Sequence, residues 1–353
     1  MSSRSAHELA LAGVVSVLGA GCLPEGAPPW LVDHEVAAAL RIEVAVRGPY
    51  SPESPRPDRE VASVLPGDEI RATPFIIGPE GPMDLDAVRP AWFYCGVTSC
   101  FGAVVAGEAG RPCGVEPLPA QDTCSMGQGA SGELRLGELT GVFELSVRPP
   151  GLFMVSGTPG GPSTQECLAR LESEEGKTLE ECLMVITPLP LGPGWRLLLL
   201  AAFLGVPDAP PTRVIPPEAA SAEPDLFPAV LPFELEIFAV DGSRRTSTAG
   251  SGASVVVRPG EVVQVVAPID PLDQQYYLDT LATSGGPLGF VSGYELLSSS
   301  WLFSADVEWA PVEPQVMRWT VPEAPPAQIF GYYLLSDQRS LAWGWLRFEV
   351  AAP

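Results

Sequence analysis

The chain has 353 residues, of which 46% are hydrophobic and 18% charged, a composition typical of a folded protein. Its net charge is −23 and Lys177 is its single lysine, so it offers no basic surface for the phosphates of DNA or RNA. Only two histidines occur, His7 and His34, which leaves the usual general base and the commonest metal ligand almost absent.

The first 22 residues have the features of an export signal. Arg4 precedes an apolar run at residues 9–18, and small residues at 19–21 come directly before Cys22. The run is too short to span a bilayer, which takes about 20 residues. A cysteine in this place resembles the lipobox of bacterial lipoproteins, which implies that Cys22 becomes the first residue and carries the acyl chains. The alternative is ordinary signal cleavage, which would leave a soluble exported protein.

Residues 23–37 contain several Pro and Gly residues and are predicted to be a tether that lifts the first domain off the membrane. Leu23 follows the cysteine in place of the aspartate associated with retention at the inner membrane. Leucine at this position favours anchoring of the protein at the outer membrane, on its periplasmic or surface face.

The six remaining cysteines predict three disulfides, as expected of an exported chain. Their spacing has no paired Cys-x-x-Cys, so we expect no zinc site. Neighbouring cysteines meet most often in the unfolded chain, which favours sequential pairing. An alternative partner for Cys95 is Cys124. The expected pairs are Cys95 with Cys100, Cys113 with Cys124, and Cys167 with Cys182.

The first domain is predicted to cover residues 38–206. Alternating apolar residues at 41–46 indicate a strand, a Pro-Gly turn at 66–67 precedes a second strand, and residues 90–95 form an aromatic strand. An insertion at 163–186 carries capping boxes at Ser163/Glu166 and Thr178/Glu181, which predict two short helices. Such helices need a clamp, and a Cys167–Cys182 bond would close the hairpin.

The same order of elements recurs after a linker at residues 207–212, in a second domain at 213–353. Each domain has short alternating strands, Gly/Pro turns and a tryptophan on a middle strand, which predicts two tandem antiparallel β-sandwiches. The matching blocks are Leu-Pro-Gly-Asp at 65–68 with Arg-Pro-Gly-Glu at 258–261, Trp-Phe at 92–93 with Trp-Leu-Phe at 301–303, residues 145–149 with 319–322, and Gly-Trp at 194–195 with Gly-Trp at 344–345.

The second domain resembles the immunoglobulin-like and PKD-like modules of exported lipoproteins of Gram-negative bacteria. The resemblance covers about 140 residues from Arg213 on, with a weaker echo in 38–206, and implies a mainly β chain of two tandem Ig-like sandwiches. The residues that carry it are Glu-Leu-Leu at 295–297, Ser-Trp-Leu-Phe at 300–303, Trp-Thr-Val-Pro at 319–322, Tyr-Tyr-Leu-Leu-Ser-Asp at 332–337 and Trp-Gly-Trp at 343–345.

No catalytic constellation stands out, so we expect a non-enzymatic protein without a cofactor. Its expected partners are the membrane, through the lipid, and an envelope protein or glycan. Loop acids at Asp84/Asp86 and Asp270/Asp273 leave calcium binding as an alternative, although loop acids are expected in any chain this acidic. A hydrolase with two catalytic carboxylates is a further, weaker alternative.

The main alternative from another class is a carbohydrate-binding or enzyme-accessory module, because five tryptophans lie between residues 301 and 345. Strand alternation places Trp343 and Trp345 on one face, where they are the candidate ligand-stacking residues. Whether that face is buried decides between the two interpretations. Trp92 and Trp301, by contrast, are expected to fill the cores.

Overall fold

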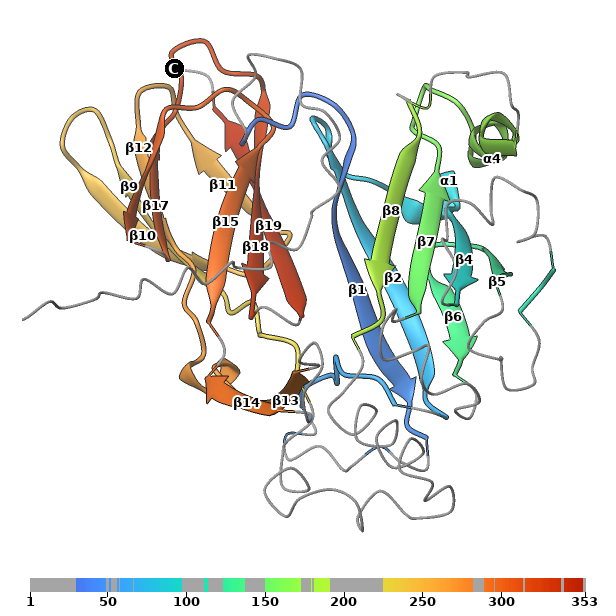
Figure 1. The fold of residues 1–353 in the computed structure, drawn as a ribbon. Coiled ribbons are helices and arrows are strands. Elements are labelled where there is room, and N and C mark those ends of the chain that lie inside the picture. The colour runs from blue at the N-terminus through green and yellow to red at the C-terminus, as the bar shows by residue number, and fades with distance from the viewer. Residues whose placement is uncertain are drawn as a thin grey trace, which may run out of the picture.

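The computed structural model of the protein describes residues 30–48, 51, 56, 58–65, 67–96, 111–113, 123–136, 150–172, 179, 181–190, 225–281, 289–294, 296–313, 315–337 and 340–351. Within these ranges the chain is mainly β, as the sequence predicts. Most of its strands belong to two pairs of sheets, here called the N-terminal and the C-terminal sheet pair, which lie side by side (Figure 1).

The N-terminal sheet pair is antiparallel throughout. In sheet I, β2 lies between β1 on one side and both β3 and β6 on the other; sheet II has the order β5-β4-β7-β8. The strands of sheet I are β1 (Val36–Val46), β2 (Glu69–Gly78), β3 (Gly81–Pro82) and β6 (Gly132–Arg135). Those of sheet II are β4 (Ala91–Cys95), β5 (Thr123–Gln128), β7 (Gly151–Ser156) and β8 (Leu183–Pro188).

Sheets I and II pack face to face around a buried cluster that contains Ile70, Ile76, Trp92 and Met154. Alternation along each strand turns every second side chain into this core. Trp92 is fully buried, and its indole N–H donates to the Gly129 carbonyl at 3.0 Å. The prediction that this tryptophan fills a core is confirmed.

The C-terminal sheet pair has one five-stranded and one four-stranded sheet. Sheet III has the order β10-β9-β12-β17-β16 and sheet IV the order β11-β19-β18-β15; β11 and β19 run parallel and the other pairs antiparallel. Sheet III contains β9 (Phe233–Phe238), β10 (Arg244–Ala249), β12 (Val262–Val266), β16 (Trp309–Glu313) and β17 (Val316–Thr320). Sheet IV contains β11 (Ser254–Val257), β15 (Ser298–Phe303), β18 (Gln328–Ser336) and β19 (Leu341–Val350).

The core of the C-terminal sheet pair is rich in aromatic side chains. Trp301, Trp319 and Tyr333 are buried together with aliphatic residues of both sheets. Trp301 therefore fills a core, as predicted. A separate hairpin of β13 (Tyr276–Leu281) and β14 (Gly289–Tyr294) follows a 3₁₀ helix at Pro271–Asp273.

The predicted repeat is present in the backbone hydrogen bonds of the two sheet pairs. The Gly67 N–H donates to the Leu136 carbonyl, and the Gly260 N–H donates to the Val321 carbonyl, each at 3.0 Å. The Leu136 N–H donates in return to the Asp68 backbone carbonyl, and the Val321 N–H donates to the Glu261 backbone carbonyl. The partner of residues 319–322 is thus the end of β6 near Leu136, not residues 145–149, which lie outside the described residues, as do residues 194–195.

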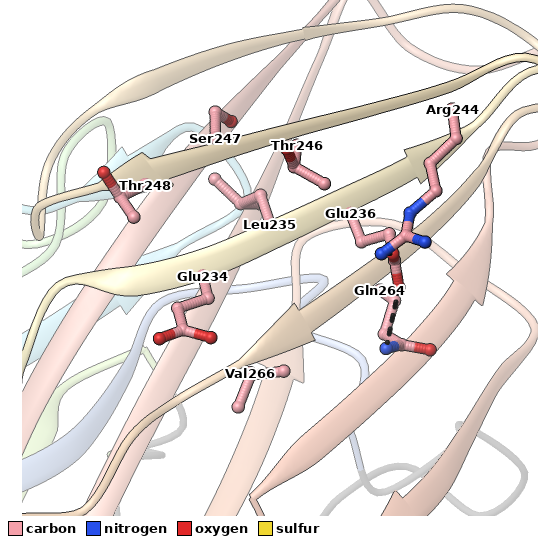
Figure 2. A pocket seen from close by; sticks show the side chains of 9 residues that line it. All are labelled: Glu234, Leu235, Glu236, Arg244, Thr246, Ser247, Thr248, Gln264 and Val266. Atoms are coloured by element: carbon pink, nitrogen blue, oxygen red, sulfur yellow. Dashed lines mark hydrogen bonds and ion pairs between the residues drawn. The ribbon is translucent and has the colours of Figure 1, made fainter.

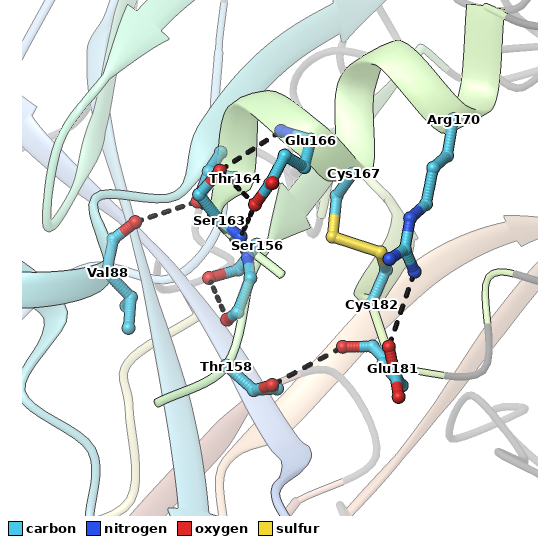
Figure 3. The surroundings of a disulfide bond; sticks show 11 residues. Val88, Ser156, Thr158, Ser163, Thr164, Glu166, Cys167, Arg170, Glu181 and Cys182 are labelled. Atoms are coloured by element: carbon cyan, nitrogen blue, oxygen red, sulfur yellow. Dashed lines mark hydrogen bonds and ion pairs between the residues drawn. A yellow bond between two sulfur atoms is a disulfide. The ribbon is translucent and has the colours of Figure 1, made fainter. Parts of the chain in front are cut away.

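The expected helical hairpin is half correct. Helix α4 (Thr164–Glu172) begins at the predicted capping box: the Glu166 N–H donates to Ser163 Oγ at 3.2 Å, and the Ser163 N–H donates to Glu166 Oε2 at 2.7 Å (Figure 3). The second helix was expected to include Leu183, but this residue begins strand β8. The edge of β7 offers backbone partners to this apolar, β-branched segment, which favours a strand over a short helix.

Helix α4 is not an independent hairpin arm, because it covers the outer face of sheet II. Phe93, Phe153 and Val155 point away from the main core and pack with Leu171 of the helix. The central strands β4 and β7 are therefore buried on both faces, whereas Ile186 on the edge strand β8 is exposed. A second, one-turn helix, α1 (Leu85–Val88), precedes β4.

The described part of the expected tether, residues 30–37, is folded. The Val32 N–H donates to the Phe303 carbonyl, and the Phe303 N–H to the Trp30 carbonyl, each at 2.7 Å, so this segment extends the edge of β15. Val32 is buried, and Val36 begins β1. The segment therefore crosses from the C-terminal to the N-terminal sheet pair instead of standing free in solvent; the expected linker at 207–212 lies outside the described residues.

Candidate functional site

The candidate functional surfaces of the molecule are the sheet faces that turn away from the two cores. The outer face of sheet I packs against the outer face of sheet IV, where Phe75 and Ile77 meet Phe330, Tyr332 and Leu334. The outer face of sheet II lies under helix α4. The outer face of sheet III is not covered by any segment that the structure describes, so it is the candidate functional surface.

A shallow hollow of about 450 Å³ lies on this outer face, over β9, β10 and β12 (Figure 2). It forms because alternation turns the apolar residues of β9 into the core and leaves its glutamates outside. Polar side chains supply most of the lining and Val266 an apolar end. The lining residues are Glu234, Leu235, Glu236, Arg244, Thr246, Ser247, Thr248, Gln264 and Val266.

Charged groups in the hollow are arranged around Glu236. Its Oε1 forms an ion pair with Arg244 on the neighbouring strand, and its Oε2 accepts a hydrogen bond from Gln264 Nε2 at 3.3 Å. Glu234, two residues earlier on β9, is exposed. With both oxygens engaged, Glu236 orients its neighbours rather than serving as a free base.

Phe238 closes one end of the same face. The guanidinium groups of Arg244 and Arg318 lie 5.9 and 5.3 Å from the centre of its ring. Both contacts are within the range of cation–π attraction. The face therefore combines carboxylate, amide, hydroxyl and guanidinium groups, a set suited to hydrogen-bonded recognition.

Trp343 and Trp345 lie on one face of β19, as strand alternation predicts, and this face packs in the interface between the sheet pairs. The rings of Trp343 and Phe75 stack with centroids 5.1 Å apart and planes 9° apart. Trp345 contacts Phe330 with ring centroids 6.0 Å apart. Both tryptophans are half-buried, so the stacking position on Trp343 is occupied by the chain itself.

The loop acids considered for calcium have protein partners. Asp270 Oδ2 lies 2.8 Å from Arg59 Nη2 and 3.2 Å from Arg56 Nη2, and Asp273 Oδ1 lies 3.1 Å from Arg59 Nη2. Asp84 Oδ1 accepts the Asp86 N–H at 3.0 Å and caps α1. In the part of the chain that the structure describes, no group of three His, Cys, Asp or Glu side chains gathers to hold a metal ion.

Two of the three predicted disulfides are present. Cys113 is bonded to Cys124, with Cα atoms 4.9 Å apart. Cys167 is bonded to Cys182, with Cα atoms 5.8 Å apart (Figure 3). Cys95 is also disulfide-bonded, and its expected partner Cys100 lies outside the described residues. The alternative Cys95–Cys124 pair is excluded because Cys124 is bonded to Cys113.

Cys22 and the whole export signal lie outside the described residues. No helix within the described ranges is both long and apolar enough to cross a membrane. No protein-family model, curated protein or solved structure matches the chain.

Sequence reasoning did not single out the residues of this hollow. The alternation of β9 indicates that Glu234 and Glu236 face outward, and the polar sequence of β10 indicates exposure. The sequence pattern does not show that the outer faces of sheets I, II and IV are covered by other parts of the chain. That packing is what makes this face the candidate.

Proposed function

We propose that the protein is a non-enzymatic exported lipoprotein, anchored through Cys22, whose two sheet pairs are Ig-like sandwiches joined into one recognition or structural body. The outer face of sheet III is its presented surface. The observation that carries the proposal is that the other outward faces are used inside the molecule, by helix α4 or by the interface.

Strand order supports the Ig-like assignment of the C-terminal sheet pair. In an Ig sandwich, strands A-B-E-D form one sheet and C-F-G the other. Within sheet III, β9-β12-β17-β16 follows the order A-B-E-D, and within sheet IV, β15-β18-β19 follows C-F-G. Strand β10 is an addition beside strand A.

The N-terminal sheet pair supports the same assignment. Its β1-β2-β6 follows A-B-E, and β4-β7-β8 follows C-F-G, with β5 beside strand C. The equivalent turns of the repeat, at Gly67 and Gly260, lie before strand B in both halves. The tandem arrangement therefore rests on topology as well as on the matching blocks.

Export and anchoring rest on the cysteines. Disulfides persist in oxidising compartments, such as the periplasm and cell surface, and are rare in the cytosol. The two described disulfides favour such a location, and the signal features before Cys22 favour a lipid anchor at the outer membrane.

Replacement of Cys22 tests the anchor. The Cys22→Ala variant is expected to move from the membrane fraction to the soluble fraction, and mass spectrometry of the wild-type N-terminus is expected to find acyl chains. If the variant stays with membranes and the wild-type N-terminus carries no lipid, the anchor proposal is wrong.

A pair of charge-reversal variants tests the presented surface. The mature protein is used to capture partners from native envelope extract, with Glu234→Lys on the hollow and Glu308→Lys on an exposed loop as the matched control. We expect loss of the captured partner only with Glu234→Lys. Equal capture by both variants would place recognition elsewhere.

Carbohydrate binding through Trp343 and Trp345 is supported less well, because a sugar would have to displace Phe75 from the Trp343 ring. Acrylamide quenching of tryptophan fluorescence tests this alternative. Efficient quenching of both indoles would favour it, and shielding would favour the packed interface.

A further inference from the structure

Most sheet edges of the molecule are closed to further strand pairing. The edge of β15 is occupied by residues 30–32, and that of β5 by residues 111–113, where the Cys113 N–H donates to the Ser125 carbonyl at 2.7 Å. Strand β16 carries Pro311 and an irregular register beside it. These are the ways in which proteins protect edge strands from pairing with other chains.

The remaining long edges of the N-terminal sheet pair are protected as well. Strand β1 has register shifts near both ends, and its Val44 N–H donates to the Val61 carbonyl at 3.0 Å. Strand β8 lies beside β1 (Figure 1). In the C-terminal sheet pair, the short β11 has its Val256 carbonyl occupied by Arg245 Nη2 at 2.9 Å.

Strand β10 differs from all of these edges. It pairs with β9 in continuous register over six residues, has no proline, and lies at the end of the sheet III order. Its first five residues are exposed, and no described segment pairs with its outer edge.

The strand is also held firmly in place. Arg245 forms two hydrogen bonds of 2.7 Å to the buried Glu261 carboxylate. The β9–β10 turn is closed by the bonds from the Ala239 N–H to the Ser243 carbonyl and from the Gly242 N–H to the Ala239 carbonyl. Gly242 has φ 84°, as a three-residue hairpin loop requires. These contacts hold the open edge of β10 in an extended conformation to which another strand can pair.

The backbone groups that face outward follow from this turn. The Ser243 carbonyl accepts the Ala239 N–H and therefore points toward β9. Along an antiparallel strand, residues whose backbone groups bond to the neighbouring strand alternate with residues whose backbone groups face away from it. The N–H and C=O groups of Arg244, Thr246 and Thr248 therefore point to the open edge of β10. These are three evenly spaced residues, each with an unpaired donor and acceptor in the described structure.

We propose that β10 is a homodimer interface, in which β10 of a second copy of this chain pairs antiparallel with it about a two-fold axis at Thr246. In this register Thr246 faces Thr246 of the second copy, and Arg244 faces Thr248. The two residues of each pair exchange two backbone hydrogen bonds. Their side chains lie on the same face of the combined sheet, as a continuous sheet requires.

Charge favours a second copy as the occupant in this register. Antiparallel pairing places Arg244 opposite a threonine, whereas parallel pairing would place like charges opposite each other. Beyond Thr248 in the same row lies the exposed Glu234 of β9, so the row that contains Arg244 of the other copy ends on a carboxylate, while Arg244 keeps its ion pair with Glu236 of its own copy. Two copies then join their sheets III into one continuous sheet. This inference does not depend on the lipid anchor.

Replacement of Thr246 by proline tests the pairing. Proline removes the outward N–H but no hydrogen bond to β9, so the fold is retained, which a thermal melt monitors. In sedimentation equilibrium from about 1 µM to about 1 mM, the full mature chain is expected to dimerise. Thr246→Pro should raise the dimer Kd about tenfold or more, and the control Thr246→Ala, which keeps the N–H, should not.

Cross-linking provides a second readout that does not depend on the proline variant folding. In a Cys22→Ala background, Thr246→Cys brings two sulfurs together across the axis, because Cα atoms of a hydrogen-bonded pair lie about 5.5 Å apart, within disulfide range. Ser247→Cys is the control, since its side chain is on the other face and its opposite residue is Arg245. A monomer at all concentrations, or equal cross-linking of both variants, would overturn the proposal.

Discussion

Two buried carboxylates occupy the same place in the two halves of the chain. Asp68 accepts the Leu65 N–H at 2.7 Å and Glu261 accepts the Arg258 N–H at 2.9 Å, each from three residues earlier. The glycines before them have φ of 82° and 77°, which a Pro-Gly turn requires. The repeat thus extends to single hydrogen bonds.

Burial dominates at Asp68 and hydrogen bonding at Glu261, so the two carboxyl pKa values are shifted in opposite directions. Burial raises the pKa of Asp68, whose other partners are the Ser51 hydroxyl and the Gly48 N–H. Hydrogen bonds from Arg245 hold the pKa of Glu261 below its ordinary value. One turn therefore contains a carboxylate that destabilises the fold as it ionises, and the other contains one that stabilises it.

The pH dependence of unfolding is expected to show this difference. Because the pKa of Glu261 is lowered in the folded state, its contribution is present above its ordinary pKa of about 4.5 and is lost as the pH falls. The urea midpoint of Glu261→Gln should lie below wild type at pH 7 and approach it in acid. A gap that widens in acid would contradict this assignment.

Asp68→Asn is the matched test in the other turn. The raised pKa of Asp68 means that the folded state holds the proton more tightly, so ionisation lowers stability as the pH rises. Relative to wild type, Asp68→Asn should therefore gain stability with rising pH, the opposite trend to Glu261→Gln. The same urea titration measures both variants.

Tyr332 connects the two sheet pairs through one hydrogen bond. Its hydroxyl donates to the Gly78 carbonyl at 2.6 Å, and burial raises the pKa of the phenol, so the donor persists in mild alkali. Tyr332→Phe should lower the free energy of unfolding by about 1–2 kcal/mol, because the carbonyl loses its buried partner. Denaturant unfolding measures this, and no change would mean that water replaces the hydroxyl.

Among the elements, helix α4 is one whose formation depends on tertiary contacts. The helix has nine residues, too few to be stable alone in water, and it is retained by its cap, by packing on sheet II and by the Cys167–Cys182 bond. The Thr164 hydroxyl also donates to the Val88 carbonyl at 2.7 Å, which fixes the start of the helix (Figure 3).

Loss of this disulfide should release the helix. The bond closes 15 residues, and the double variant Cys167→Ala/Cys182→Ala should lose about 3 kcal/mol of stability on the loop-entropy estimate. Hydrogen exchange should then show faster exchange of residues 164–172 than of β7. Unchanged protection of the helix would mean that packing alone holds it on sheet II.

At the scale of the molecule, the two sheet pairs form one body. Aromatic stacking across the interface is joined by the ion pairs of Arg56 and Arg59 with Asp270 and Asp273. The segment at 225–229 adds backbone bonds to residues 60–62, and the Arg41 guanidinium lies 4.3 Å from the centre of the Phe227 ring. A folded connection of this kind favours unfolding in a single transition.

Removal of Phe75 should uncouple the two sheet pairs. Its ring is buried between Tyr332 and Trp343, and its loss should cost about 3–5 kcal/mol. Calorimetry should resolve one transition for wild type and two for Phe75→Ala. The control Phe238→Ala, on the free face of sheet III, should keep the single transition; two transitions in wild type would show that the sheet pairs unfold independently.

The local features of this protein follow from short stretches of its sequence. Period-two alternation at 41–46 indicated β1, the Pro-Gly turn and the aromatic run at 90–95 indicated β2 and β4, the Ser163/Glu166 box identified the start of α4, and the spacing of cysteines identified two of the disulfide pairs. These features depend on neighbours within a few residues or on short loops, so their physical causes are written in adjacent positions.

Which surfaces remain free depends on tertiary contacts. Trp343 has the same alternation whether its face binds a ligand or Phe75, and Leu183 joins a strand because β7 presents an edge to it. Glu236 becomes part of a candidate surface because the other outward faces are covered. Such outcomes depend on contacts between residues far apart in the chain, whose energies no local pattern contains.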